Sequence, residues 1–501
     1  MKTTIIALAL ATGLSPATPP TTPPAGGLTP AAVDAYLTRA LDGTGLPGLS
    51  AVVTRGNRVV HAAGYGHDSD GRPVTADTPM RVASLSKSFT AMAVMTLVDK
   101  GAVALDDPVT EHLPELRMAD PRAGRITVRH LLNQTSGLSD TTTDIGALKD
   151  SDSLREYVGR LRTATLRADP GTRWEYCNVN YDLAARLVEV VSGRGFGDYL
   201  RERVFGPLGM RSSAVSDREV RPADGYNSVF GLWRSRPELP AFLNGGGSGG
   251  VVTTAADMGR WLITQTGNGR RLVRPESLAV MHAPSEVREY GMGWGIDDET
   301  RRLGHSGNLF TYTAVQLVVP ATGYGFAVMT NSAALHDDTF DIATGLAELS
   351  EGRTPEPAGG GRQLFELVLG AVTAAAAGLG LLGVLRSRHW AARRAGRPRW
   401  RAWSRLVPAL LPVAVLAAYP DLISFLMNGR TVTWEQLTYF AVPLTITVAV
   451  AAAAGALTAG FRLARLRAAG GRRHGEHRPS RTAATPGEPS ADPMTGARPR
   501  R

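Results

Sequence analysis

The segment Ser84-Leu85-Ser86-Lys87 decides how the rest of this 501-residue chain is interpreted. The chain contains four lysines and 51 arginines, yet one of those lysines, Lys87, follows a serine by three residues. A buried lysine can release its proton, whereas an arginine cannot. Because residues three apart share one face of a helix, the segment predicts a nucleophilic hydroxyl, Ser84, beside an activating amine, which is a recurring arrangement in acyl transfer.

The residues after Ser84 favour a buried helix that ends before Gly101. Phe89, Met92 and Leu97 recur at helical spacing, and other apolar residues fill the remaining sides. A helix that is apolar almost all round is typically buried. Ser84 would then lie at the N-terminus of a central helix, where free backbone amides favour developing negative charge.

Two further groups of polar residues follow along the chain. Tyr176 and Asn178 lie two apart in an extended segment before a predicted helix over residues 179–192, so their side chains point the same way. A phenol can take part in proton transfer, and an amide can hold a carbonyl or an amine. His305 would add a donor or a partial positive charge, and Gly307 would let a substrate backbone approach closely. Taken alone, each group also fits buried or turn-forming residues without a chemical role.

The strand pattern predicts two hairpins, one near each end of the first 350 residues. Residues 49–54 and 58–63 flank a Gly-Asn turn, and residues 312–319 and 324–330 flank a Pro-Ala-Thr-Gly turn. The stretches between the hairpins are mostly helical in pattern. This order suggests an antiparallel sheet faced by helices, with a helical insertion.

Together, the three polar groups in this order resemble the serine hydrolase family of class C β-lactamases, DD-peptidases (penicillin-binding proteins), D-aminopeptidases and related esterases. Four segments are similar to those of this family: Arg81-Val-Ala-Ser-Leu-Ser-Lys-Ser-Phe-Thr90, Ile126-Thr-Val-Arg-His-Leu-Leu-Asn-Gln-Thr-Ser-Gly137, Pro170-Gly-Thr-Arg-Trp-Glu-Tyr-Cys-Asn178 and Gly249-Gly-Val-Val-Thr-Thr254. The resemblance runs from about residue 30 to 350. It implies a β-lactamase/transpeptidase-like α+β fold, with an antiparallel sheet flanked by helices and a helical insertion, here followed by three transmembrane helices.

The resemblance also implies the catalytic residues. Ser84 would be the acylated nucleophile, and Lys87 and Tyr176 would share the proton transfers, with the choice of general base left open between them. The sequence contains no metal-ligand spacing and no phosphate-binding loop. We therefore expect neither a metal nor a cofactor.

The same resemblance implies four substrate-binding residues. Asn178 would orient the catalytic lysine and a substrate amide, and His305 would line the far wall of the site beside Gly307. The oxyanion hole would be formed by the backbone N–H groups of Ser84 and Asn308. Class C β-lactamases carry Lys-Thr-Gly where this chain has His-Ser-Gly, a difference that favours peptidase or esterase chemistry over β-lactam hydrolysis.

Composition divides the chain into six segments. These are a signal peptide (1–17), a Pro-rich linker (18–30), the hydrolase domain (31–350), a second linker (351–363), a three-helix transmembrane region (364–461) and a disordered basic cytoplasmic tail (462–501). The three apolar runs span residues 364–385, 406–427 and about 439–461, and each is long enough to cross a bilayer. Three buried helices of a soluble domain are the alternative, but nothing amphipathic joins the runs.

Arginines set the expected orientation of these helices. The loop over residues 386–405 and the stretch after residue 461 are rich in arginine, whereas the loop between the second and third runs holds only Arg430. The positive-inside rule therefore places both Arg-rich stretches in the cytoplasm and residues 18–363 outside. Residues 386–501 carry a net charge of +14, whereas residues 1–385 carry about −4, which gives the total of +10. The basic composition therefore belongs to the membrane region and does not indicate nucleic-acid binding.

These observations predict a multi-pass cell-membrane protein with an extracytoplasmic serine hydrolase domain. Its partners would be membrane lipid and a small-molecule or peptide substrate, with cell-wall peptide among the candidates, cleaved through an acyl-enzyme at a peptide, amide or ester bond. The alternative is a penicillin-binding sensor that acylates without turnover and signals through the three helices. Such a sensor needs a folded cytoplasmic module, and residues 462–501 are too poor in apolar residues to form one.

Overall fold

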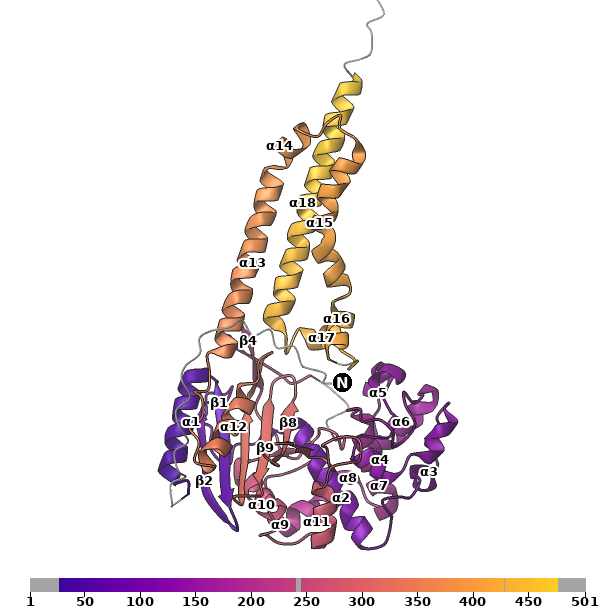
Figure 1. Cartoon of the computed structure of the whole chain (residues 1–501), viewed down its shortest axis with the longest axis vertical. Coiled ribbons are helices and arrows are strands. Elements are labelled where there is room, and N and C mark those ends of the chain that lie inside the picture. The colour runs from indigo at the N-terminus through magenta and orange to yellow at the C-terminus, as the bar shows by residue number, and fades with distance from the viewer. Residues whose placement is uncertain (1–26, 240–244, 428, 476–501) are drawn as a thin grey trace, which may run out of the picture. The chain divides into compact units, whose positions relative to one another are not determined.

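The catalytic part of the chain is built on a six-stranded antiparallel sheet in the order β2-β1-β10-β9-β8-β7 (Figure 1). The computed structural model describes residues 27–239, 245–427 and 429–475. The strands are β1 (Gly48–Arg55), β2 (Arg58–Gly66), β7 (Gly295–Ile296), β8 (Leu303–Asn308), β9 (Thr313–Val319) and β10 (Tyr324–Thr330). Both predicted hairpins are confirmed, and the first pairs with the second through β1 and β10.

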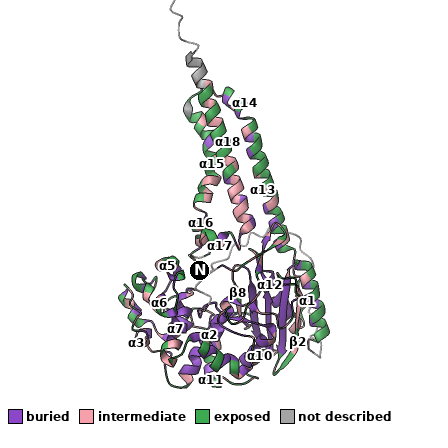
Figure 2. Ribbon diagram, turned by 180° about the vertical axis from the view of Figure 1, so that it is seen from behind, coloured by how far each residue is buried: buried purple, intermediate pink, exposed green. Residues whose placement is uncertain are grey.

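Both faces of this sheet are covered by helices, as predicted. Helices α1 (Pro30–Thr44) and α12 (Asp338–Ser350) pack on one face, and α10 (Ala255–Gln265) packs on the other. The buried residues of β1 alternate accordingly: Leu49, Ala51 and Val53 join the core under α1 and α12, whereas Val52 joins the larger core on the opposite side. Figure 2 shows much of the sheet buried and the outer side of α1 exposed, and the central strands β1, β9 and β10 are buried along almost their whole length.

The helical insertion lies between β3 (Met80–Arg81) and β6 (Val252–Thr253), which pair with each other. Its helices are α2 (Ser86–Asp99), α3 (Val109–His112), α4 (Val128–Leu132), α5 (Ile145–Lys149), α6 (Leu154–Gly159), α7 (Val179–Ser192), α8 (Phe196–Leu200) and α9 (Gly206–Leu208). The central helix α2 is buried along most of its length and packs against α7, which has the predicted bounds. Helix α2 starts two residues later than expected, because a short 3₁₀ turn, η1 (Ala83–Leu85), precedes it.

Shorter elements complete this part of the chain. A three-stranded sheet contains β11 (Ser332–Ala333), β4 (Gly225–Val229) and β5 (Leu232–Arg236), and α11 (Pro275–His282) follows α10. Residues 351–360, after α12, form neither helix nor strand, which fits most of the linker predicted for residues 351–363. Helix α13 begins at Gly361, and Arg362 is buried, with hydrogen bonds to Asp338 (3.0 Å) and the Thr44 carbonyl (2.6 Å).

The C-terminal helices are long and apolar. They are α13 (Gly361–Leu385), α14 (Ser387–Ala392), α15 (Arg399–Ala417), α16 (Tyr419–Leu426), α17 (Trp434–Leu437) and α18 (Val442–Gly475). By length and composition, α13 and α18 could each cross a membrane, and α15 with α16 could form a third span. The outer surface of α13 is apolar yet exposed, with Leu367 and Leu379 each 70% accessible (Figure 2), which suits contact with lipid rather than water.

The second apolar run differs from the single straight helix that was predicted. It bends by 65° between α15 and α16, at Ala418. Pro420 explains the break, because a proline ring lacks an N–H and clashes with the carbonyl four residues earlier. The predicted disordered tail also starts too early, since α18 continues to Gly475 through Ala-, Leu- and Arg-rich sequence that favours a helix.

The chain forms two compact units: Met1–Thr373 with Ala418–Thr447, and Ala374–Ala417 with Val448–Arg501. In the second unit, helices approach closely at small residues. A Cβ added to Gly380 would lie 2.5 Å from the Ala454 Cβ, and one added to Gly455 would collide with the Ala409 carbonyl. Such contacts are typical of helices packed in lipid. The predicted signal peptide and the end of the tail lie outside the described residues.

Candidate active site

Ser84 lies in η1, between the β3–β6 pair and the start of α2. The preceding residue, Ala83, has φ +48°, an uncommon conformation for a residue with a side chain. Gly307 of β8 packs on this turn: a Cβ there would collide with the Val82 carbonyl and lie 3.0 Å from the Ser84 N. The glycine of the third motif is therefore needed for close approach by the chain itself, and the close approach of a substrate there remains a prediction.

Lys87 reaches back to Ser84 from the first turn of α2. Its Nζ donates to Ser84 Oγ (3.0 Å), Asn178 Oδ1 (2.9 Å) and the Ser248 carbonyl (2.7 Å). All three ammonium hydrogens thus have acceptors, and the side chain is fully buried. The Lys87 amine thus brings together Ser84 of the first predicted group and Asn178 of the second.

Tyr176 completes the contacts of the nucleophile. Its hydroxyl donates to Ser84 Oγ at 2.8 Å, and its ring centroid lies 4.8 Å from the Lys87 Nζ. Ser84 is therefore in hydrogen-bond contact with both candidate proton-transfer groups. Since Ser84 is also partly exposed, an incoming substrate can reach its hydroxyl.

Burial lowers the pKa of the Lys87 amine, because a charge removed from water is disfavoured. The Tyr176 phenol and the Asp182 carboxylate act in the opposite direction and raise this pKa. Asp182 is itself fully buried in α7, and burial raises the pKa of its carboxyl to about 6. The net effect is a lowered pKa, so the Lys87 amine gives up its proton more easily than an exposed lysine does.

Asp182 acts on Lys87 through Ser248, a connection that sequence reasoning missed. The Ser248 N–H and hydroxyl donate to the two Asp182 carboxylate oxygens, each at 3.0 Å, and the Ser248 carbonyl accepts from the Lys87 amine. The sequence carried only weak signals for this connection. Asp182 lies four residues after Asn178, on the same face of the predicted helix, and Ser248 directly precedes the Gly249 segment.

The second family-like segment holds Tyr176 and Asn178 in place from behind. Gln134 Oε1 accepts from the Cys177 backbone N–H (3.1 Å) and from the Asn180 amide (2.6 Å), and its backbone has φ +64°. Cys177 is buried and points away from the nucleophile, with Sγ 3.4 Å from Asp140 Oδ1. The strained glutamine thus fixes the start of α7, and with it Asn178 Oδ1 on the lysine.

His305 lies on β8, against the ring of Tyr290, another residue that sequence reasoning missed. Its Nδ1 is 2.6 Å from the Ser306 carbonyl, so Nδ1 donates and Nε2 accepts from the Tyr290 hydroxyl at 3.2 Å. Removal from water, together with the nearby Lys87 charge, lowers the pKa of His305 to about 4. The lowered pKa favours the neutral imidazole at ordinary pH, and the donor or partial positive charge expected of His305 toward a substrate remains a prediction.

Asn308 ends β8, opposite Thr313 of β9. Ser84 lies in the first turn of η1, where a backbone N–H has no acceptor within the helix. The oxyanion hole formed by the N–H groups of Ser84 and Asn308 remains a prediction. The contact of Gly307 with the serine turn places the two backbone segments side by side, as this prediction requires.

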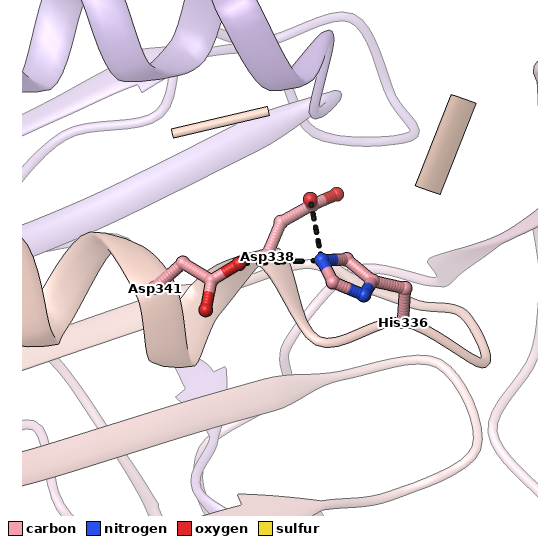
Figure 3. A group of neighbouring side chains, drawn as sticks. All are labelled: His336, Asp338 and Asp341. Atoms are coloured by element: carbon pink, nitrogen blue, oxygen red, sulfur yellow. Dashed lines mark hydrogen bonds and ion pairs between the residues drawn. The ribbon is translucent and has the colours of Figure 1, made fainter. Parts of the chain in front are cut away.

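Two other features of the described residues lie apart from this group. A pocket of about 430 Å³ is lined by Met92, His282 and Leu303 among others, and includes none of the predicted site residues. His336, Asp338 and Asp341 lie close enough together to hold a metal ion (Figure 3). However, Asp338 is already paired with the Arg362 guanidinium (3.0 Å) at the N-terminus of α12, where the helix dipole disfavours a cation.

Comparison with known proteins identifies the family. Residues 33–350 match the beta-lactamase family. The chain belongs to this family. Penicillin-binding protein 4 of Amycolatopsis lactamdurans is 31% identical over 344 residues, which cover 62% of this chain and 88% of that protein.

Solved structures of the beta-lactamase family agree in fold. The octameric penicillin-binding protein homologue from Pyrococcus abyssi is 26% identical, with a TM-score of 0.56 over 67% of this chain and 80% of that one. The D-amino acid amidase from Ochrobactrum anthropi SV3, complexed with L-phenylalanine amide, is 28% identical, with a TM-score of 0.52 over 64% of this chain and 94% of that one. This beta-lactamase family chain is thus an enzyme, a serine hydrolase.

Proposed function

We propose that this protein is a membrane-anchored serine hydrolase that cleaves a peptide, amide or ester bond through an acyl-enzyme on Ser84, with its catalytic domain outside the cell. The observation that carries the proposal is the hydroxyl of Ser84, which contacts both the Lys87 amine (3.0 Å) and the Tyr176 phenol (2.8 Å). Two proton-transfer groups on one hydroxyl are what activation of a serine nucleophile requires.

The steps follow from these contacts. With one member of the Lys87–Tyr176 pair deprotonated, Ser84 Oγ attacks the substrate carbonyl carbon while its proton passes to that member, and the backbone N–H groups of Ser84 and Asn308 bind the oxyanion. The leaving amine or alcohol takes this proton from the pair. Water then gives a proton to the pair and attacks the acyl carbon, and the pair returns the proton to Ser84 Oγ as the acid leaves. Asn178 holds the lysine amine on the serine throughout.

The neutral His305 favours amide and ester substrates over recognition by charge. With a pKa lowered to about 4, its imidazole is neutral at neutral pH, and its two ring nitrogens are hydrogen-bonded to Ser306 and Tyr290. The D-amino acid amidase and the penicillin-binding relatives act on amides or bind penicillin, as their names state. We therefore place D-amino acid amides first among candidate substrates, ahead of D-Ala-D-Ala peptides and β-lactams, which carry a free carboxylate.

The test uses the full chain, purified in detergent, with Ser84→Ala as the matched control. Hydrolysis of D-Ala-D-Ala peptides, D-amino acid amides, short-chain esters and nitrocefin is followed, and the acyl adduct is located by mass spectrometry. We expect turnover of at least one substrate class and an adduct on Ser84 only, both lost in Ser84→Ala. An adduct that persists without turnover would favour the penicillin-binding sensor, and labelling of another serine would overturn the assignment.

A further inference from the structure

The loop between α16 and α17 carries an arginine to the edge of the active site. The Arg430 Nε donates to Asp140 Oδ2 at 2.8 Å, and the Thr431 hydroxyl lies 3.3 Å from the Asp140 carbonyl. The Asp140 side chain is only 7% exposed. A buried carboxylate with an arginine partner is a strong, geometrically defined contact, so this loop is held on the hydrolase domain rather than lying free above it.

The guanidinium of Arg430 lies against the phenol that contacts the nucleophile. Its Cζ is 5.2 Å from the ring centroid of Tyr176, within the range of a cation–π interaction. Asp140 also accepts from the thiol of Cys177, the residue next to Tyr176. One carboxylate thus links the arginine and the backbone that carries the phenol, and the ring is held by both.

Other charged groups near Lys87 are accounted for. The amine faces the Tyr176 phenol, the Asp182 carboxylate of α7 and the neutral His305 of β8. The Arg430 charge is the remaining group, and it lowers the pKa of Lys87. Arg430 itself faces Asp140, Tyr176 and Cys177. None of these three contacts of Arg430 is used in the mechanism above.

We propose that Arg430 is a positioning residue of the hydrolase site, which holds the Tyr176 ring on Ser84 from the loop between α16 and α17. This inference rests on the proposed function of Ser84, Lys87 and Tyr176. It assigns to the C-terminal region a part in catalysis beyond anchoring the domain.

The chain offers a matched control for this role. Arg236 of β5 also binds the segment between α17 and α18, with its guanidinium 3.6 Å from the Tyr439 ring centroid and a hydrogen bond to the Thr438 carbonyl. It touches neither Tyr176 nor Asp140. Arg236→Ala therefore removes an arginine contact to the neighbouring segment between α17 and α18 without removing the group that lies on the phenol.

The experiment measures kcat and KM against pH for the full chain in detergent and for Arg430→Ala, Arg430→Lys and Arg236→Ala. For Arg430→Ala we expect kcat to fall about tenfold with little change in KM, the scale of a lost cation–π contact at a partly buried ring. The acid limb of kcat/KM should move to higher pH, because a proton acceptor near the lost positive charge binds its proton more tightly. Arg430→Lys should restore the acid limb and part of kcat, and Arg236→Ala should match the wild type.

Three outcomes would overturn the proposal: unchanged kinetics in Arg430→Ala, an equal loss in Arg236→Ala, or a loss with an unmoved acid limb that lysine does not restore. Each would make Arg430 a structural contact only. Labelling with a fluorophosphonate probe separates this failure from failure of the proposed function. If the wild type labels on Ser84 and turns over, the hydrolase assignment stands whatever Arg430 does. If Ser84 never labels, the hydrolase assignment fails and Arg430 has no catalytic group to position.

Discussion

Lys87 shows at the residue scale why one cation cannot replace another. Nearly every positive charge of this chain is an arginine, and arginines hold its surface ion pairs, where a fixed charge suffices. The buried position beside Ser84 instead has a lysine, whose pKa is lowered by burial. An amine that can lose its proton is required only at a place where a proton moves.

The first prediction exchanges this amine. Lys87→Arg should reduce kcat by about 10²–10⁴-fold, nearly as much as Lys87→Ala, because a guanidinium keeps its proton at working pH. The measurement is steady-state hydrolysis of the best substrate. Lys100→Arg makes the same exchange at the exposed C-terminal end of the same helix and should behave as wild type. Near-normal turnover in Lys87→Arg would mean that Lys87 supplies only positive charge.

The second prediction concerns His305. Because its pKa is lowered to about 4, the imidazole should stay neutral from pH 6 to 9. The ratio of kcat/KM for a substrate with a free carboxylate to that for its amidated form should then be constant over this range. If the ratio falls as the pH rises from 6 to 7.5, the imidazole is charged in the site and binds the carboxylate.

The same pKa predicts an effect on stability. The unfolded imidazole binds a proton below about pH 6.5, whereas the folded one resists until about pH 4. The folded state is therefore favoured above pH 6.5, and this contribution is lost as the pH falls toward 4. In thermal unfolding scans of the full chain, His305→Asn should show a weaker loss of Tm between pH 6.5 and 4.5. An unchanged acid slope would contradict the lowered pKa.

At the element scale, local signals predicted the framework well. The Gly56-Asn57 turn and the alternation around it give β1 and β2, and the turn before Tyr176 precedes a helix whose bounds, Val179–Ser192, are as predicted. Ser84, Lys87, Tyr176 and Asn178 also meet as expected, because the resemblance supplied their long-range pairing.

What the sequence could not reveal were contacts between distant segments. Ser248, Tyr290 and Arg430 reach the site from separate parts of the chain, and none belongs to a recognisable spacing. The sequence prediction missed the bend at Ala418 because it rested on the hydropathy of the whole second apolar run rather than on the helix-breaking effect of Pro420. The predicted linker proved to include the buried Arg362, whose role depends on Asp338, a partner 24 residues earlier.

The third prediction tests helix packing in the second unit. A Cβ at Gly380 would lie 2.5 Å from the Ala454 Cβ, whereas one at Gly378 would meet nothing within 4 Å. Gly380→Ala should therefore lower the Tm in detergent, since overpacking costs about 1–3 kcal/mol. Gly378→Ala, on the same helix, should leave the Tm unchanged or raise it, because alanine favours the helix. Equal Tm values for the two variants would show that these helices are not in close contact.

At the scale of the whole molecule, the apolar helices and the arginines define a topology. Helices α13 and α18 are each long and apolar enough to span a bilayer, and the Arg-rich stretches flank them on one side only. Moving these arginines across a membrane is strongly disfavoured. This preference supports the proposed topology, in which the hydrolase domain faces outside and the C-terminus faces the cytoplasm.

The fourth prediction follows from this topology. Protease added to intact protoplasts should digest the domain spanning residues 31–350, whereas a tag placed after Arg501 should stay protected until the membrane is permeabilised. Immunoblotting for both regions makes the measurement. A tag that is digested from outside would reverse the orientation, and protection of both regions would place the catalytic domain inside the cell.

The shortage of lysine also makes this enzyme a poor target for amine-directed chemistry. Among the described residues, Lys100 and Lys149 are exposed, whereas the amine of Lys87 is shielded and bound by three acceptors. Aldehyde fixatives, activated esters and cross-linkers should thus attach at the two exposed lysines and leave turnover intact. A reagent small enough to enter the site would be the exception, and an acyl group on Ser84 should block its access to Lys87.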